Sequence, residues 1–138
     1  MSKVIKVKSG TKYEEIASYS RLVSVGDQIF LSNTAGRNPV TKEMPEGVTE
    51  QAMMAVSNVE RALKAVESCL ADVVAIRVYV PDPQDADAVG IVLGAAFRGI
   101  DPALTLTCPP LASTVYKMEM DVTAIRGAGK AETVYITL

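Results

Sequence analysis

The fold is decided by residues 49–80, which read TEQAMMAVSNVERALKAVESCLADVVAIRVYV. Apolar residues recur in the first part of this stretch at spacings of four, three, four, three and four, which places them in one stripe along a helix. The members of the stripe are Ala52, Val56, Val59, Leu63, Val66 and Leu70. The pattern predicts a helix over residues 49–70 and a valine-rich strand over residues 72–80.

The segments before this helix are extended. We predict strands at residues 4–8, 22–25 and 28–33, the last two joined by Gly26-Asp27, a pair typical of a tight hairpin. Residues 35–47 hold two glycines and two prolines and are therefore expected to form a loop.

After the valine-rich strand, Asp82-Pro83 suits the start of a second helix, whose apolar face includes Val89, Leu93 and Phe97. Three further strands are predicted, at residues 104–108, 115–125 and 131–138. In the second of these, one face is apolar: Tyr116, Met118, Met120, Val122 and Ala124. The order β-β-β-α-β-α-β-β-β predicts one α+β domain over residues 1–138, with two layers, a mostly antiparallel sheet and both helices on one face. The other face would meet water or a partner.

Composition excludes several classes of function. The 138 residues carry a net charge of −2 and contain no histidine. The charge argues against nucleic acid as the partner. The missing histidine excludes Ser–His and Cys–His dyads and every histidine-containing metal site. No apolar run suits a signal peptide or a membrane span, so we expect a cytoplasmic protein without a membrane partner, in which Cys69 and Cys108 are reduced, buried thiols.

Two weak motifs have simpler explanations. Residues 127–130, GAGK, do not lie between a strand and a helix, and are predicted to form a turn between the last two strands rather than a phosphate loop. Asp82, Asp85 and Asp87 could crowd a cation, but carboxylates in the first turn of a helix also suit its dipole. No metal site is therefore expected.

Three polar residues near strands have two possible roles. Glu119 shares a strand face with Lys117 and Asp121, and that face could simply be solvated. Alternatively, a carboxylate on a rigid strand beside a cleft could carry a proton to or from a substrate or water. Tyr19 and Ser32 could likewise be structural or could bind a ligand.

The chain resembles the Rid family (RidA/YjgF, reactive intermediate deaminases) from about residue 19 to residue 124. The segments that carry the resemblance are YS at 19–20, VGDQIFLS at 25–32, NP at 38–39, residues 51–63, DVV at 72–74, VYV at 78–80, PA at 102–103 and KMEMD at 117–121. The resemblance implies a chorismate-mutase-like fold and a homotrimer whose sheets surround a central barrel, with small-molecule clefts between subunits. It also implies hydrolysis of imines or enamines without a metal or an organic cofactor.

Carried over by position, the resemblance assigns the acid/base role to Glu119 and ligand contacts to Tyr19, to the backbone of Ser32 and to the carbonyl near Leu106. The arginine with which the family grips a substrate carboxylate is absent, because Leu104 occupies its position. Gly90 replaces an asparagine that is usual on the second helix.

These departures leave two options for the ligand. Another cation could replace the arginine, with Arg21, Arg37 and Arg77 as candidates, or the ligand could lack a carboxylate. Two functions follow as hypotheses: a Rid-like hydrolase or deaminase acting on a small imine, enamine or related carbonyl metabolite, and a non-catalytic trimer that binds a small, apolar or neutral metabolite. An endoribonuclease or translation inhibitor, a label of several relatives, has little support in a chain with no basic stripe and few aromatic residues.

Overall fold

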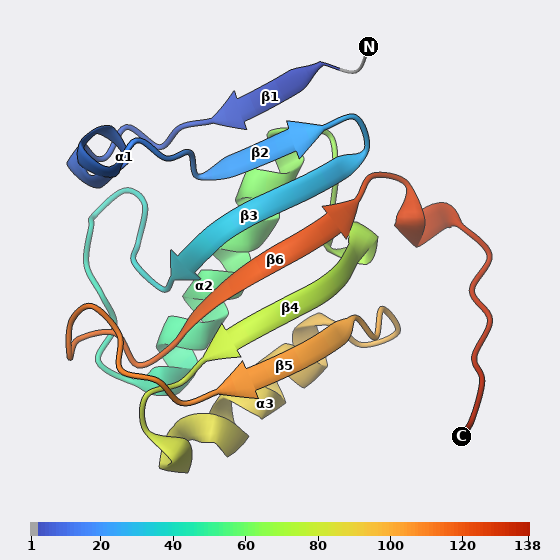
Figure 1. Ribbon diagram of the computed structural model, residues 1–138. Helices are drawn as coiled ribbons and strands as arrows, with labels where there is room; N and C mark the ends of the chain where they lie inside the picture. The colour runs from blue at the N-terminus through green and yellow to red at the C-terminus, as the bar shows by residue number, and fades with distance from the viewer. Residues whose placement is uncertain (1–2) are drawn as a thin grey trace.

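The computed structural model describes residues 3–138 and contains one six-stranded sheet (Figure 1). The strands are β1 (Val4–Val7), β2 (Leu22–Val25), β3 (Gln28–Ala35), β4 (Val73–Tyr79), β5 (Ala103–Thr107) and β6 (Glu119–Ile125). Their order is β1-β2-β3-β6-β4-β5, and all neighbours are antiparallel except β4 and β5, which run parallel. The prediction of an α+β fold with one mostly antiparallel sheet is confirmed.

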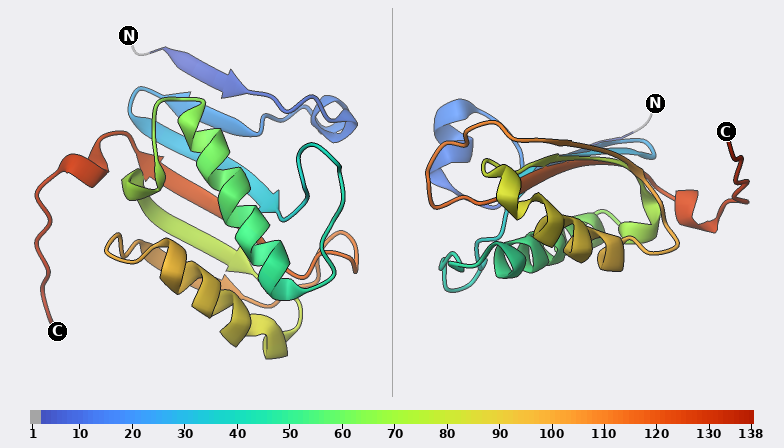
Figure 2. Two further views of the ribbon diagram at one scale, coloured as in Figure 1. Left: turned by 180° about the vertical axis from the view of Figure 1, so that it is seen from behind. Right: turned by 90° about the horizontal axis from the view of Figure 1, so that it is seen from below.

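Two helices, α2 (Val48–Lys64) and α3 (Ala86–Ala96), cover the same face of the sheet (Figure 2, right). The predicted apolar stripe is the buried side of α2, where Ala52, Val59 and Leu63 are fully buried. From the sheet, β6 contributes its even-numbered residues to the same core, as the alternation predicted. The core therefore lies between one sheet face and two helices, and residues 3–138 leave the opposite sheet face uncovered.

The first long helix ends earlier than its apolar stripe suggests. The N–H of Ser68 donates to the carbonyl of Leu63 (3.0 Å), and the N–H of Glu67 donates to Lys64 (3.1 Å), while Glu67 has a φ of +60°. This is the hydrogen-bond pattern with which a left-handed residue terminates a helix. Val66 remains buried because the reversed chain folds back over the core.

The strand predicted over residues 115–125 begins only at Glu119, because a buried glutamine binds the backbone before it. Gln51 on α2 is 1% exposed, and its Nε2 donates to the carbonyls of Pro45 (2.7 Å) and Val115 (2.9 Å). Its Oε1 accepts from the N–H of Lys117 (2.9 Å). These bonds join both loops to α2 and take backbone groups that a longer strand would offer to the sheet.

One helix near the start of the chain was not predicted, and the prediction of a strand at its end was wrong. A short helix, α1 (Lys12–Ala17), follows β1, and its start is marked by Thr11, whose Oγ1 accepts from the N–H of Glu14 (3.3 Å). No strand forms over residues 131–138. Instead, residues 127–130 form a turn after β6, and the chain then leaves the sheet (Figure 1). Because β6 lies between β3 and β4, a strand directly after it finds no free edge beside it.

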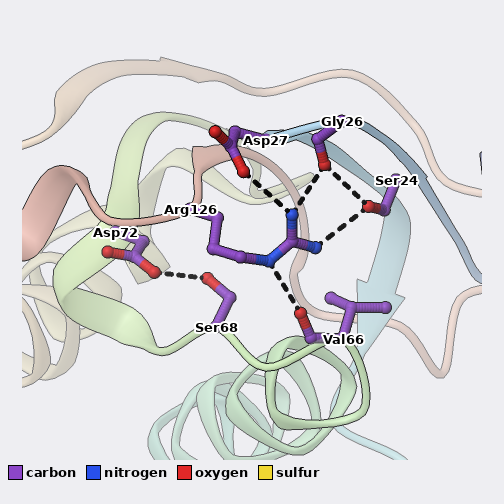
Figure 3. Close-up of polar contacts among 7 residues, drawn as sticks. All are labelled: Ser24, Gly26, Asp27, Val66, Ser68, Asp72 and Arg126. Carbon is purple, nitrogen blue, oxygen red and sulfur yellow. Dashed lines mark hydrogen bonds and ion pairs between the residues drawn. The ribbon is translucent and has the colours of Figure 1, made fainter. Parts of the chain in front are cut away.

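Polar contacts fix the end of the sheet at the β2–β3 hairpin (Figure 3). The guanidinium of Arg126, just after β6, donates to the carbonyls of Val66 (3.0 Å) and Gly26 (2.6 Å) and to Ser24 Oγ (3.0 Å). It also pairs with Asp27 at 3.3 Å. The Arg126 side chain thus links the hairpin to β6 and to the end of α2. This network lies at the hairpin end of the sheet and does not extend to the opposite end.

Neither thiol is buried. Cys69 and Cys108 are both free and both exposed, which corrects the prediction of buried thiols. Each lies just outside a regular element, where the backbone is near the surface. Among residues 3–138, no helix combines the length and the hydropathy that a bilayer crossing requires.

Candidate functional site

A cleft of about 750 Å³ lies at the end of the sheet where β3 stops and β6 starts. Its walls come from residues 7–21, from β3 and the loop after it, and from one side of α2, with Tyr116 and Glu119 completing the lining. The volume is in the range of small-molecule sites. The segments on both sides of the cleft, α1 with its flanks and the loop after β3, lie at the left of Figure 1.

Glu119 enters the cleft because its neighbours in β6 are committed to the core. Met118 and Met120 are fully buried, so the alternation of the strand turns Glu119 to the other face. Glu119 pairs with Ala35 on β3 and with Tyr79 on β4, which makes its backbone part of the sheet interior. The acid is therefore carried by rigid backbone rather than by a loop.

The carboxylate of Glu119 has a polar partner supplied by a bulge in β3. Between Leu31 and Thr34 the pairing with β6 gains one residue on β3, so Thr34 takes a buried position opposite Met120. Asn33 is thereby turned toward the acid, and its Nδ2 donates to Glu119 Oε2 at 2.7 Å.

The electrostatic environment of Glu119 suits proton transfer. The side chain is half-buried, and this burial raises the pKa of Glu119 above its ordinary value. The positive charge of Arg21 and the hydrogen bond from Asn33 lower the pKa, but they offset only part of the effect of burial. A carboxyl group whose pKa is raised holds a proton more readily than an ordinary carboxyl group, which suits a group that accepts and returns a proton.

Tyr19 and Ser32 line the same cleft as Glu119. Ser32 holds the segment before β2 in place: its hydroxyl donates to the carbonyl of Ser20 (2.8 Å) and its N–H donates to Arg21 (3.0 Å). Tyr19 follows α1 and its ring lies 6.0 Å from the guanidinium carbon of Arg21. The structure thus gathers three of the sequence-predicted site residues around one cavity.

The three candidate arginines separate into two groups. Arg21 and Arg37 line the cleft. Arg21 Nη2 donates to the carbonyl of Asn33 (2.5 Å), and Arg37 Nη1 donates to the carbonyl of Lys42 (2.7 Å). Arg77 lies outside the cleft lining and pairs with Asp121 at 3.1 Å.

Leu104, Leu106 and Gly90 do not reach this cleft within one chain. Leu104 and Leu106 belong to β5, at the edge of the sheet and two strands away from β6. Leu104 is 51% exposed. Gly90 lies on α3, where an added Cβ would meet nothing within 4 Å.

Asn33 and Arg61 also line the cleft, although no sequence motif singled them out. The signal for Asn33 was a polar residue where the alternation of Ile29 and Leu31 calls for an apolar one, which indicates a bulge. Arg61 shows no comparable signal, because a cation on a helix is ordinarily solvated.

A six-stranded sheet with two helices on one face and an acid-bearing cleft at one end defines a class of small α+β proteins. The family model described as Endoribonuclease L-PSP matches residues 10–126. The chain therefore belongs to this family, the RidA/YjgF/UK114 group, and the resemblance found in the sequence is confirmed.

Similar proteins agree with this assignment. A 2-iminobutanoate/2-iminopropanoate deaminase of Mus musculus is 31% identical over 130 residues, covering 92% of this chain and 96% of that protein. One from Dermatophagoides farinae is 30% identical over 91 residues, covering 65% and 71%. The crystal structure of a YjgF/YER057c/UK114 family member from Mycobacterium tuberculosis is 28% identical with a TM-score of 0.81, covering 89% of this chain and 99% of that one.

Proposed function

We propose that this chain is a hydrolase of the imine deaminase type, which converts a small imine or enamine to the carbonyl compound and ammonia. The observation that carries the proposal is Glu119, a half-buried carboxyl group in a cleft with a raised pKa and an amide partner. Membership in a family whose similar members are named 2-iminobutanoate/2-iminopropanoate deaminase supports this type of reaction.

In the proposed reaction, Glu119 moves protons and forms no covalent bond to the substrate. Its carboxylate accepts a proton from water as the water oxygen attacks the imine carbon, and it returns that proton to the nitrogen. The resulting carbinolamine loses its hydroxyl proton to Glu119 as the C–N bond breaks, and the nitrogen leaves as ammonia with the proton that Glu119 supplies. The balance is one imine and one water consumed, with one carbonyl compound and one ammonia formed.

We also propose that three copies assemble in the chorismate-mutase-like manner, with the sheets around a central barrel. The uncovered sheet face carries exposed apolar side chains, among them Phe30 (45% exposed) and Ile125 (42% exposed), which supports a protein partner there. In such a trimer, Leu104, Leu106 and Gly90 would reach the cleft of a neighbouring copy, and Tyr19, Ser32 and Glu119 would contact the ligand from this one.

A non-catalytic trimer that binds a small metabolite is the second candidate. The observation that favours it is Leu104, since this position offers no charge to a substrate carboxylate. The two functions differ in the fate of the ligand. A catalyst releases ammonia, whereas a binding protein returns the ligand unchanged.

The experiment compares the wild type with Glu119→Gln on imines generated in situ by an amino acid oxidase, with ammonia release measured above the uncatalysed rate. We expect the variant to lose roughly a hundredfold or more in rate, because general acid–base catalysis contributes about that much. Glu132→Gln is the control, because Glu132 is exposed and lies outside the cleft. Equal rates for the wild type and Glu119→Gln would refute the proposal.

A further inference from the structure

The cleft has a charge opposite to that of the whole chain. The chain carries a net charge of −2, yet Glu119 is the single carboxylate that lines the cleft within the described residues. Six cationic residues line the same cleft: Lys8, Lys12, Arg21, Arg37, Lys42 and Arg61. A concave site lined by one sign of charge concentrates ligands of the other sign. The cleft is therefore built to attract an anion rather than an apolar or neutral ligand.

None of these six cations forms an ion pair among residues 3–138, where the ion pairs are Lys64–Glu60, Arg77–Asp121 and Arg126–Asp27. Uncharged groups hold several of them instead. Lys8 Nζ donates to the carbonyl of Tyr19 (2.5 Å), and Lys42 Nζ donates to the carbonyl of Pro39 (2.9 Å). Carbonyl groups orient a cation but leave its full charge available to a ligand.

Arg21 is the cation placed to act beside Glu119. One end of its guanidinium is anchored on the carbonyl of Asn33, the residue whose side chain also binds Glu119. Its Nε is buried and has no hydrogen-bond partner in the described part of the chain. Arg21 and Glu119 line one cleft without forming an ion pair, although the charge of Arg21 acts on the acid. The terminal nitrogens of a planar guanidinium match a carboxylate or a phosphate, whereas the buried Nε is not open to a ligand.

A second set of cations lies on the other wall of the same cleft. Arg37 and Lys42 belong to the loop after β3, and Arg61 belongs to α2. Asn58 on α2 fixes the start of this loop, because its Nδ2 donates to the carbonyls of Ala35 (3.0 Å) and Arg37 (2.8 Å). Arg37 is further placed by the ring of Tyr116, 5.9 Å from its guanidinium carbon. A ligand with a single negative charge would leave this second set unneutralised.

We propose that the cleft selects a small organic dianion, with Arg21 binding the anionic group next to the reacting carbon and the Arg37, Lys42 and Arg61 set binding the second group. The proposal rests on the proposed function for the site of reaction beside Glu119. It assigns the substrate class as imines or enamines of oxo acids that carry a second carboxylate or a phosphate. Arg21 thereby binds the substrate carboxylate in place of the arginine that is absent at position 104.

The test uses stable oxo acids, whose binding needs no chemistry from Glu119. Isothermal titration of the full chain compares 2-oxobutanoate, a monoanion, with 2-oxoglutarate, a dianion. We expect the dianion to bind at least about tenfold more tightly, as one further charge-assisted contact would give. Arg21→Gln should weaken both ligands by about tenfold or more, Arg37→Gln should weaken only the dianion, and Arg77→Gln, outside the cleft, should change neither.

Other outcomes overturn the proposal. Equal affinity for the two acids, or unchanged binding by a folded Arg21→Gln variant, would refute it. If Arg21→Gln does not fold, Arg21→Lys replaces it, with the charge kept and the planar fork lost, and unchanged binding again refutes the proposal. The proposal would also be refuted if a single-stranded RNA oligonucleotide bound more tightly than 2-oxoglutarate and displaced it. Because Glu119→Gln removes no cation, its preference for the dianion should persist even where catalysis is lost, so a failure of catalysis and a failure of dianion binding are observed separately.

Discussion

The side-chain amide of Asn33 donates to the carboxylate of Glu119 across 2.7 Å, joining residues 86 positions apart in the chain. The contact depends on the bulge in β3, without which the alternation of the strand would send Asn33 into the core. It also couples the acid to Arg21, because the backbone carbonyl of Asn33 accepts from the guanidinium.

Replacing Asn33 with alanine removes a hydrogen bond that favours the ionised acid. Because that bond lowers the pKa of Glu119, its loss should raise the pKa further. The acidic limb of the pH–rate profile should then move to higher pH, and the rate measured on that limb should fall roughly tenfold, about the effect of one hydrogen bond to a charged group. Thr133→Ala, at an exposed position outside the cleft, is the control. An unmoved profile in Asn33→Ala would mean that Asn33 does not act on the acid.

Glu119→Gln should be more stable than the wild type at pH 8. Burial raises the folded-state pKa of Glu119, so the folded chain holds this proton more tightly than the unfolded chain and the ionised acid opposes folding. This destabilisation begins as the pH rises above the pKa of glutamate in the unfolded chain, about 4.3, and it is complete above the pKa of Glu119 in the folded chain. Thermal denaturation at pH 8 and pH 4 measures this, with a higher Tm for the variant at pH 8 alone. A lower Tm at pH 8 would contradict the argument, and the exposed Glu132→Gln is the control.

Asp72 should make the fold sensitive to acid. It is 5% exposed, and its carboxylate accepts from Ser68 Oγ (2.7 Å) and from the N–H of Gly129 (2.9 Å). Burial raises its pKa, but these hydrogen bonds outweigh that effect and hold the pKa below its ordinary value. The stability it contributes is therefore present above the unfolded value of about 3.9 and is lost as the pH falls through the folded pKa.

Asp72→Ala leaves two donors without a partner, at a cost of about 1–3 kcal/mol for each that stays buried. Urea denaturation between pH 3 and pH 7 should show that the variant loses less stability on acidification than the wild type. Asp72→Asn keeps an acceptor and should recover part of the loss at pH 7. Parallel pH curves for the wild type and Asp72→Ala would show that Asp72 is not the responsible group.

Gly36 is required by a close approach of two backbones. A Cβ at this position would lie 2.2 Å from the carbonyl oxygen of Gln51, so Gly36→Ala would push the loop after β3 away from α2. We expect a loss of about 1–3 kcal/mol in the free energy of unfolding, as for overpacking elsewhere. The matched control is Gly94→Ala in α3, where the nearest atom lies at 3.7 Å and the better helix propensity of alanine should add up to about 1 kcal/mol. Equal stability of the two variants would show that the contact is relaxed at little cost.

Local patterns in the sequence predicted most of the helices and strands. The stripe from Ala52 to Val66 and the alternation from Met118 to Ala124 both mark residues that the structure buries, fully or, for Val56, in part. The predictions failed at the end of the first long helix and at the last predicted strand. The apolar stripe continues past the end of α2, since hydrophobic spacing does not register the left-handed turn at Glu67. Residues 131–138 alternate like a strand, but a strand forms only where another offers its backbone groups.

The sequence by itself determined the layers, the topology class, the family and the acid at position 119, because periodicity, turn residues and motif order are properties of the linear chain. Only the tertiary structure decided which cations line the same cleft as that acid. Arg21, Arg37 and Arg77 were equivalent candidates in the sequence, and the fold places the first two in the cleft and pairs the third with Asp121 outside it. The physical reason is that charge selectivity depends on distances through space, and these are set by the β3 bulge and by the loop that Asn58 holds against α2.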